Sequence, residues 1–110
     1  MSQITIYDLL PEEPRPDFHT MTAEQIVNYL NEVLGVNFTW NEHLQEYTVN
    51  MNTKNYGKFM LEFELDSYTM SDDPKNGQPF LGCGYSWSKG GSASPCDSLE
   101  EAIKFYKRYL

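Results

Sequence analysis

The stretch Lys58-Phe-Met-Leu-Glu-Phe-Glu-Leu-Asp66 alternates between apolar and polar residues with a period of two. This period predicts a β-strand with one face on a core and the other in water. The outward positions include three successive carboxylates, Glu62, Glu64 and Asp66. Because like charges this close repel one another, the face is either only a solvated surface or the binding surface for something basic.

Turn-forming segments bound this strand on both sides. Asn52–Gly57 precedes it, and Ser71–Gly77 follows it and ends in Asn-Gly, a typical hairpin pair. A further strand is expected on each side of these turns. The predicted strands lie within Phe38–Met51 (where Phe38–Trp40 could be a separate short strand), at about Lys58–Met70 and at about Pro79–Ser88. The segment Gly90–Pro95 has the composition of a flexible loop.

Two amphipathic helices enclose the strands in the sequence. The first is expected over Thr22–Gly35, with Thr22 as N-cap, Gln25 completing a capping box and Gly35 as the stop. The second begins after Ser98, with Glu101 at the capping-box position. Its expected buried stripe is Leu99, Ala102, Ile103, Tyr106 and Leu110.

The order helix, three strands, helix predicts an α+β fold. We expect a three- or four-stranded antiparallel sheet with both helices packed on one face. Residues 1–21 form a proline-containing N-terminal arm, and residues 22–110 form a single domain. The acidic row then lies on the open face of the sheet.

The charge balance restricts the class of partner. The 110 residues carry 16 acidic and 8 basic side chains, a net charge of −8. Nucleic acids and anionic membranes would be repelled, whereas a basic protein would be attracted. No signal peptide or membrane-spanning stretch is visible, so we expect a cytoplasmic protein.

The predicted topology resembles that of double-stranded RNA-binding domains. Those domains place lysines at the start of the last helix to contact phosphates. Here the same place reads Cys96-Asp97-Ser98-Leu99-Glu100-Glu101. Because this charge has the wrong sign, we expect no direct binding of nucleic acid.

The thiols and imidazoles do not form a catalytic pattern. Cys83 lies in an apolar strand and is expected to be buried, and Cys96 is expected to be a surface or half-buried thiol near a helix N-terminus. His19 and His43 are the only imidazoles, and both are distant from Cys96 in the sequence. We therefore expect a protein that is not an enzyme. The alternative class at this point is a small hydrolase or redox protein that uses Cys96.

No metal or cofactor site is expected. The cysteine and histidine spacings do not match zinc motifs, and Gly90-Gly91 is not followed by the Lys-Ser or Lys-Thr of a phosphate-binding loop. Asp72 and Asp73 lack the ligand spacing of a calcium loop. They are instead predicted to extend the acidic surface beside the strand.

Aromatic residues add a second signal for binding. A core this small does not accommodate every aromatic side chain, and an exposed ring beside carboxylates makes a good protein interface. Residues 1–21 or a second copy of the chain could cover these rings instead. The residues concerned are Trp40, Tyr56, Tyr68 and Phe80.

Part of the sequence resembles small acidic proteins encoded by phages and prophages of Gram-positive bacteria. The resemblance covers about half of the chain and rests on Ile4–Pro11, Gly82–Trp87, Gly90-Gly91 and Ser94–Ile103. It implies a genomic setting in which anti-CRISPR proteins, compact α+β domains with acidic surfaces, disarm host defence.

The predicted function is a phage-derived inhibitory binding protein. Its partner would be a basic host protein such as a defence nuclease. Glu62, Glu64 and Asp66, with Asp72 and Asp73, would occupy a basic nucleic-acid-binding surface of this partner. The alternative is a structural or assembly module, a homodimer joined through the open sheet face.

Overall fold

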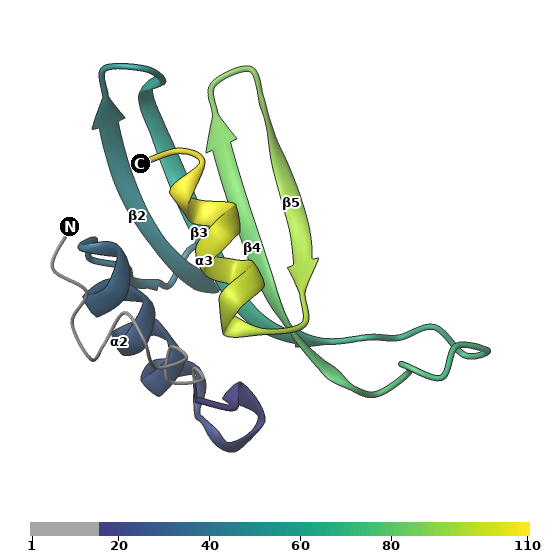
Figure 1. The fold of residues 1–110 in the computed structure, drawn as a ribbon. Helices are drawn as coiled ribbons and strands as arrows, with labels where there is room; N and C mark the ends of the chain where they lie inside the picture. The colour runs from purple at the N-terminus through teal and green to yellow at the C-terminus, as the bar shows by residue number, and fades with distance from the viewer. Residues whose placement is uncertain (1–15) are drawn as a thin grey trace, which may run out of the picture.

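The computed structural model describes residues 16–110 as an α+β arrangement of two helices and a five-stranded antiparallel sheet. The strands occur in the sheet in sequence order, so the sheet is a meander (Figure 1). The elements are the short 3₁₀-helix η1 (Phe18–Thr20), α2 (Ala23–Leu34), β1 (Thr39–Asn41), β2 (Glu46–Thr53), β3 (Gly57–Ser67), β4 (Pro79–Trp87), β5 (Gly90–Cys96) and α3 (Leu99–Lys107).

The sheet has more strands than the sequence predicted. The expected first strand divides into β1 and β2, and the separate short strand considered at Phe38–Trp40 is β1, shifted by one residue. The expectation of a flexible loop at Gly90–Pro95 is wrong, because this segment is β5. A two-residue turn, Ser88-Lys89, returns the chain so that every residue of β5 pairs with β4. Pairing therefore imposes the extended conformation on residues with little strand propensity of their own.

Helix α2 begins and ends as predicted. The Thr22 hydroxyl accepts a hydrogen bond from the Gln25 amide at 3.1 Å, and the Gln25 side chain accepts one from the Thr22 amide at 2.9 Å. These reciprocal bonds are a capping box. Gly35 ends the helix with φ of 68°, a left-handed conformation that glycine adopts without strain.

Helix α3 differs from prediction in two details. Ser98 caps it by accepting a 3.1 Å bond from the Glu101 amide, but the Glu101 carboxylate accepts from the Asp97 amide, at 2.8 Å, rather than from that of Ser98. The helix ends at Lys107. Leu110 is therefore 44% exposed, and its assignment to the buried stripe is wrong.

The core lies between the helices and one face of the sheet. Both helices contribute to one cluster together with Phe59, Leu61 and Phe63 of β3, as the alternation predicted. Leu65 continues the alternation but is 38% exposed, which corrects the prediction. Leu65 lies near the end of β3, just before a hairpin that projects from the domain (Figure 1).

The projecting hairpin, residues 68–78, joins β3 to β4. The Tyr68 and Phe80 rings pack at its base with centroids 4.6 Å apart. The Tyr68 hydroxyl donates to Asp97 at 2.8 Å, and the Lys75 ammonium group forms an ion pair with the same carboxylate at 3.1 Å. These contacts tie the hairpin to the start of α3.

The predicted N-terminal arm lies mostly outside the described residues. Within the described part, Phe18 of η1 is buried and belongs to the core. The arm therefore merges with the domain before residue 21. No helix within residues 16–110 is long and apolar enough to span a membrane.

Candidate functional site: an acidic groove on the open sheet face

The open face of the sheet carries a groove of about 630 Å³, called here the acidic groove. Every charged side chain in its lining is a carboxylate: Glu46, Glu62, Glu64 and Asp66. Uncharged side chains, several of them apolar, complete the wall toward the projecting hairpin, including Tyr68, Met70, Phe80 and Pro95. The site thus combines negative charge with hydrophobic contact area.

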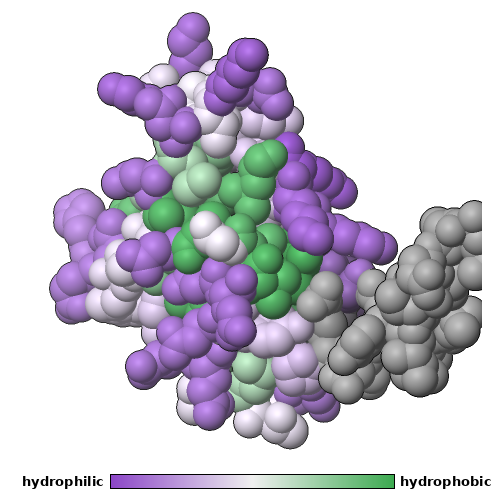
Figure 2. Space-filling view, turned by 60° about the vertical axis from the view of Figure 1, so that its left-hand side comes forward, coloured by the Kyte–Doolittle hydropathy of each residue, from purple (hydrophilic) through white to green (hydrophobic). Residues whose placement is uncertain are grey.

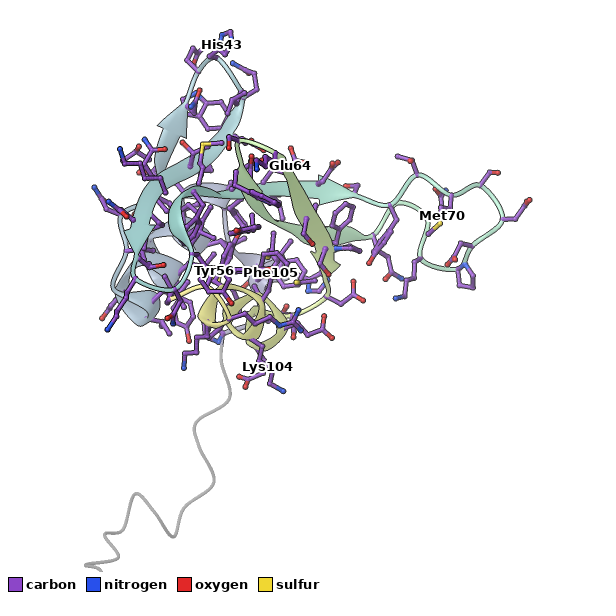
Figure 3. The ribbon with its side chains drawn as sticks, turned by 90° about the horizontal axis from the view of Figure 1, so that it is seen from above. His43, Tyr56, Glu64, Met70, Lys104 and Phe105 are labelled. Carbon is purple, nitrogen blue, oxygen red and sulfur yellow. The ribbon has the colours of Figure 1, made fainter. Side chains whose placement is uncertain are left out.

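The central strand positions three of the four carboxylates. Glu62, Glu64 and Asp66 take alternate positions on β3, which has two strands on each side. Figure 3 shows Glu64 on the opposite side of the sheet from Lys104 and Phe105 of α3. The sequence-predicted acidic row therefore lies on the open face, as expected.

Glycines of β4 form the floor beside the acidic row. Gly84 stands opposite Glu62 in the register, and Gly82 stands opposite Glu64. A Cβ on Gly84 would lie 3.2 Å from Cβ of Glu62, and one on Gly82 would lie 3.0 Å from Cγ of Glu64. The two glutamate side chains therefore lean over β4, where any larger residue would displace them.

Sequence reasoning missed Glu46 of β2. Burial, a hydrogen bond with the Glu62 carboxyl group and repulsion from Glu62 and Glu64 raise the pKa of Glu46 to about 7. Burial and repulsion from Asp66 and Glu62 also raise the pKa of Glu64. The groove is therefore an electrostatically strained cluster with no cation in its lining to relieve it.

The alternation in β2 could have pointed to Glu46. Tyr47, Val49 and Met51 face the core, so the residue before Tyr47 must face outward. Its position beside the acidic row depends on the register, in which Tyr47 pairs with Phe63. The sequence left this register undetermined.

Asp72 and Asp73 are not brought together with the acidic row. They lie in the turn of the projecting hairpin, and neither lines the groove. The Asp73 carboxylate accepts a hydrogen bond from the Lys75 amide at 2.8 Å. Asp73 thus has a turn-stabilising role, and the five-residue acidic surface predicted from sequence divides into two separate parts.

The four aromatic residues singled out from sequence also divide. Tyr68 and Phe80 line the acidic groove. Trp40, 48% exposed, packs edge-on against Tyr47 with centroids 5.1 Å apart. Because Tyr47 belongs to the core side, Trp40 is not on the open face. Tyr56 also packs with core-side rings, including Phe59 and Tyr109.

Both thiols are buried. This confirms the prediction for Cys83 and corrects that for Cys96, which is only 3% exposed. A hydrogen bond with the Cys96 sulfur, together with burial, raises the pKa of Cys83. His19 is engaged elsewhere, with its ring Nδ1 2.6 Å from the Asp17 carboxylate. Within residues 16–110 no group of three or more His, Cys, Asp or Glu side chains is placed to hold a metal ion.

A second surface lies on the side of β2 and α2. Figure 2 shows a hydrophobic patch there, surrounded by hydrophilic residues. Partly buried Val49 and Met51 of β2, together with Val33 in the last turn of α2 and Val36 just after its cap, flank the core in this region. This surface is separate from the acidic groove.

Comparison with family models, with curated proteins and with solved structures finds no match to this chain. The functional argument therefore rests on the geometry and charge of the groove. Clustered carboxylates beside apolar side chains are suited to a ligand that is itself cationic and partly apolar.

Proposed function

We propose that this protein is a non-enzymatic inhibitory binding protein that occupies a basic surface on a host protein. In the phage setting implied by the sequence resemblance, the partner is a defence nuclease, and the occupied surface is one that binds nucleic acid. One observation carries the proposal: four carboxylates line a single groove whose lining contains no Lys, Arg or His.

The spacing of the carboxylates supports mimicry of a phosphate backbone. Alternate residues on a strand are about 6.5–7 Å apart, comparable to the separation of neighbouring phosphates on a nucleic-acid strand. Glu62, Glu64 and Asp66 occupy three such positions on the central strand. A basic channel that contacts phosphates could contact this row in the same way.

The alternative, a homodimer joined through the open face, has an electrostatic obstacle. Two copies meeting there would bring together two sets of the same four carboxylates. Repulsion opposes this unless protons or cations neutralise the groups. The third class, a hydrolase or redox protein using Cys96, requires access that a 3% exposed thiol does not offer.

Charge reversal tests the proposal. The chain is assayed for inhibition of DNA cleavage by guide-loaded CRISPR effector nucleases and for their capture in a pull-down. We expect Glu62→Lys/Glu64→Lys to abolish both effects. The control, Glu24→Lys/Glu32→Lys, makes the same change in net charge on exposed positions of α2 and should retain both effects. Equal activity of the two variants, or inhibition of no effector, would count against the proposal.

A further inference from the structure

The strand β5 is an edge of the sheet whose only usual protecting feature in its own sequence is Pro95, near its C-terminal end. It pairs with β4 on one side, and within residues 16–110 no strand pairs with its other side (Figure 1). Exposed edges are normally blocked by charged side chains, prolines, bulges or covering segments. Gly90-Gly-Ser-Ala-Ser-Pro-Cys96 has no charged side chain, and five of its seven residues are exposed.

The register shows which backbone groups point away from the sheet. A two-residue turn follows Trp87, so the Trp87–Gly90 pair that closes it exchanges hydrogen bonds. Alternation along the antiparallel pair then directs Gly91, Ala93 and Pro95 outward. Pro95 fits this position because it has no N–H to donate to β4. The free edge thus offers two N–H donors and three C=O acceptors.

A low shelf connects this edge to the carboxylates. The open-face residues of β4 and β5 beside Glu62 and Glu64 are small: Gly82, Gly84, Ala93 and Pro95, with Gly91 next along β5. A hollow of about 310 Å³ runs along the shelf from Glu62 to β5. The Glu62 carboxylate already leans over β4, with Oε2 3.6 Å from where a Cβ of Gly84 would lie.

We propose that the free edge of β5 takes up an extended segment of the partner as an additional antiparallel strand, whose alternate Lys or Arg side chains cross the shelf to Glu62 and Glu64. This inference rests on the proposed function and specifies how its basic partner is held. Main-chain hydrogen bonds would supply affinity, and the alternate side chains would supply specificity.

The dimensions of the shelf suit long basic side chains. Neighbouring strands are about 4.8 Å apart, so an added strand would lie about 10 Å from β4. The aliphatic stems of Lys and Arg can lie on Ala93 and Pro95 while their charged ends reach the carboxylates. Alternate residues of the added strand repeat at the same interval as Glu62 and Glu64, so successive cations would meet successive carboxylates.

A set of matched peptides separates strand addition from simple charge attraction. The probe is an end-capped octapeptide, (Thr-Arg)₄, titrated into the full chain by calorimetry. In an antiparallel added strand, residues whose side chains share the open face with Ala93 point their N–H groups at β5. N-methylation of the arginines should therefore weaken binding about tenfold or more, whereas N-methylation of the threonines should not. Equal binding of the two N-methylated peptides would overturn the proposal.

Hydrogen exchange shows whether the edge is free. We expect the Gly91 and Ala93 amides to exchange rapidly in the full chain alone and to become protected with the peptide. The Ser92 and Ser94 amides, which face β4, serve as controls that are slow in both states. Protection of Gly91 and Ala93 without peptide would overturn the proposal, because residues 1–15 or a second copy would then occupy the edge.

Carboxylate variants distinguish the two proposals. The double variant Glu62→Gln/Glu64→Gln should weaken the binding of all three peptides, the unmodified octapeptide and its two N-methylated forms. The control double variant Glu24→Gln/Glu32→Gln should bind them as the wild type does. If these groove variants lose nuclease inhibition while N-methylation has no effect, strand addition is wrong and the proposed function stands. If N-methylation acts as expected but the groove variants still inhibit nucleases, the edge binds peptides and the proposed function is wrong.

Discussion

The hydroxyl group of Tyr106 in α3 donates a 2.5 Å hydrogen bond to the main-chain carbonyl of Glu62 in β3, 44 residues earlier in the chain. Tyr106 is fully buried on the helix side of the sheet. The side chain of Glu62 points the other way, into the acidic groove. Glu62 thus connects the core to the groove. Its main chain is held by Tyr106 on the helix side of the sheet, and its carboxylate lines the groove on the other side.

Removal of this hydrogen bond should cost measurable stability. We expect Tyr106→Phe to lower the free energy of unfolding by about 1 kcal/mol, because the ring still fills the core while the carbonyl loses a donor. Urea denaturation followed by circular dichroism measures the change. Tyr109→Phe is the control, since its hydroxyl forms no hydrogen bond seen among the described residues. An equal loss in both variants would show that the bond to Glu62 contributes nothing specific.

Filling the glycine floor should damage the groove. In Gly84→Val the new side chain meets Glu62, whose Cβ is 3.2 Å from where the new Cβ would lie. We expect a loss of about 1–3 kcal/mol from overpacking and weaker binding of basic peptides. The control, Asn50→Val, places the same residue at an exposed open-face position of β2 that lines neither the acidic groove nor the hollow along the shelf. The idea fails if Gly84→Val binds as tightly as the wild type.

Local signals predicted the elements that local interactions determine. Thr22 and Gln25 predict the start of α2 because a capping box involves residues only three positions apart. The alternation over Phe59–Phe63 announces β3 because it reflects burial on one face. No such signal exists for β5, whose small residues become a strand only through pairing with β4.

The groove was only partly predictable for the same reason. Glu62, Glu64 and Asp66 follow one another on a single strand, so their shared face could be read directly. Glu46 reaches them through the register between β2 and β3, which the chain does not encode locally. Asp72 and Asp73 are near the row in sequence but not in the groove, because the hairpin projects from the domain (Figure 3).

The anchoring of the projecting hairpin should depend on Asp97. Hydrogen bonds from Tyr68 and then from Lys75 lower the pKa of the Asp97 carboxyl group. We expect Asp97→Asn to speed exchange of the Tyr68 and Gly77 amides, which bond across the hairpin. Little change in global stability should accompany it, because the contacts are exposed.

The effect of pH on this anchor has a definite sign. A carboxyl group whose pKa is lower in the folded than in the unfolded protein stabilises the fold at pH values above its unfolded pKa, near 3.8 for Asp97. This stabilisation is lost as the pH falls through the folded-state pKa. Exchange in wild type and Asp97→Asn should thus differ at neutral pH and converge once Asp97 is protonated. Asp72→Asn, in the hairpin turn, should resemble the wild type. If it speeds exchange as much as Asp97→Asn, the anchor is misassigned.

The pairing of Glu46 with Glu62 should make the fold less stable as pH rises. The pKa of Glu46 is raised from 4.5 to about 7 by burial and by Glu62. A group whose pKa is higher in the folded than in the unfolded protein stabilises the fold fully at pH values below its unfolded pKa. This contribution is lost as the pH rises through the folded-state pKa. The free energy of unfolding should therefore fall between pH 5 and pH 8. We expect a change on the order of 1 kcal/mol, because solvent screens these partly exposed groups.

Glu46→Gln should remove most of this pH dependence, since the amide does not titrate. Urea denaturation at four pH values from 5 to 8 gives the slopes for the wild type, for Glu46→Gln and for the control Glu32→Gln, whose carboxyl group lies exposed on α2. Binding should show the opposite trend. A cation that enters the groove must displace the proton of Glu46, so affinity for a basic peptide should increase from pH 6 to pH 8 in the wild type. If Glu46→Gln keeps the wild-type slope in both measurements, the proton lies elsewhere and the groove is not the cluster that titrates.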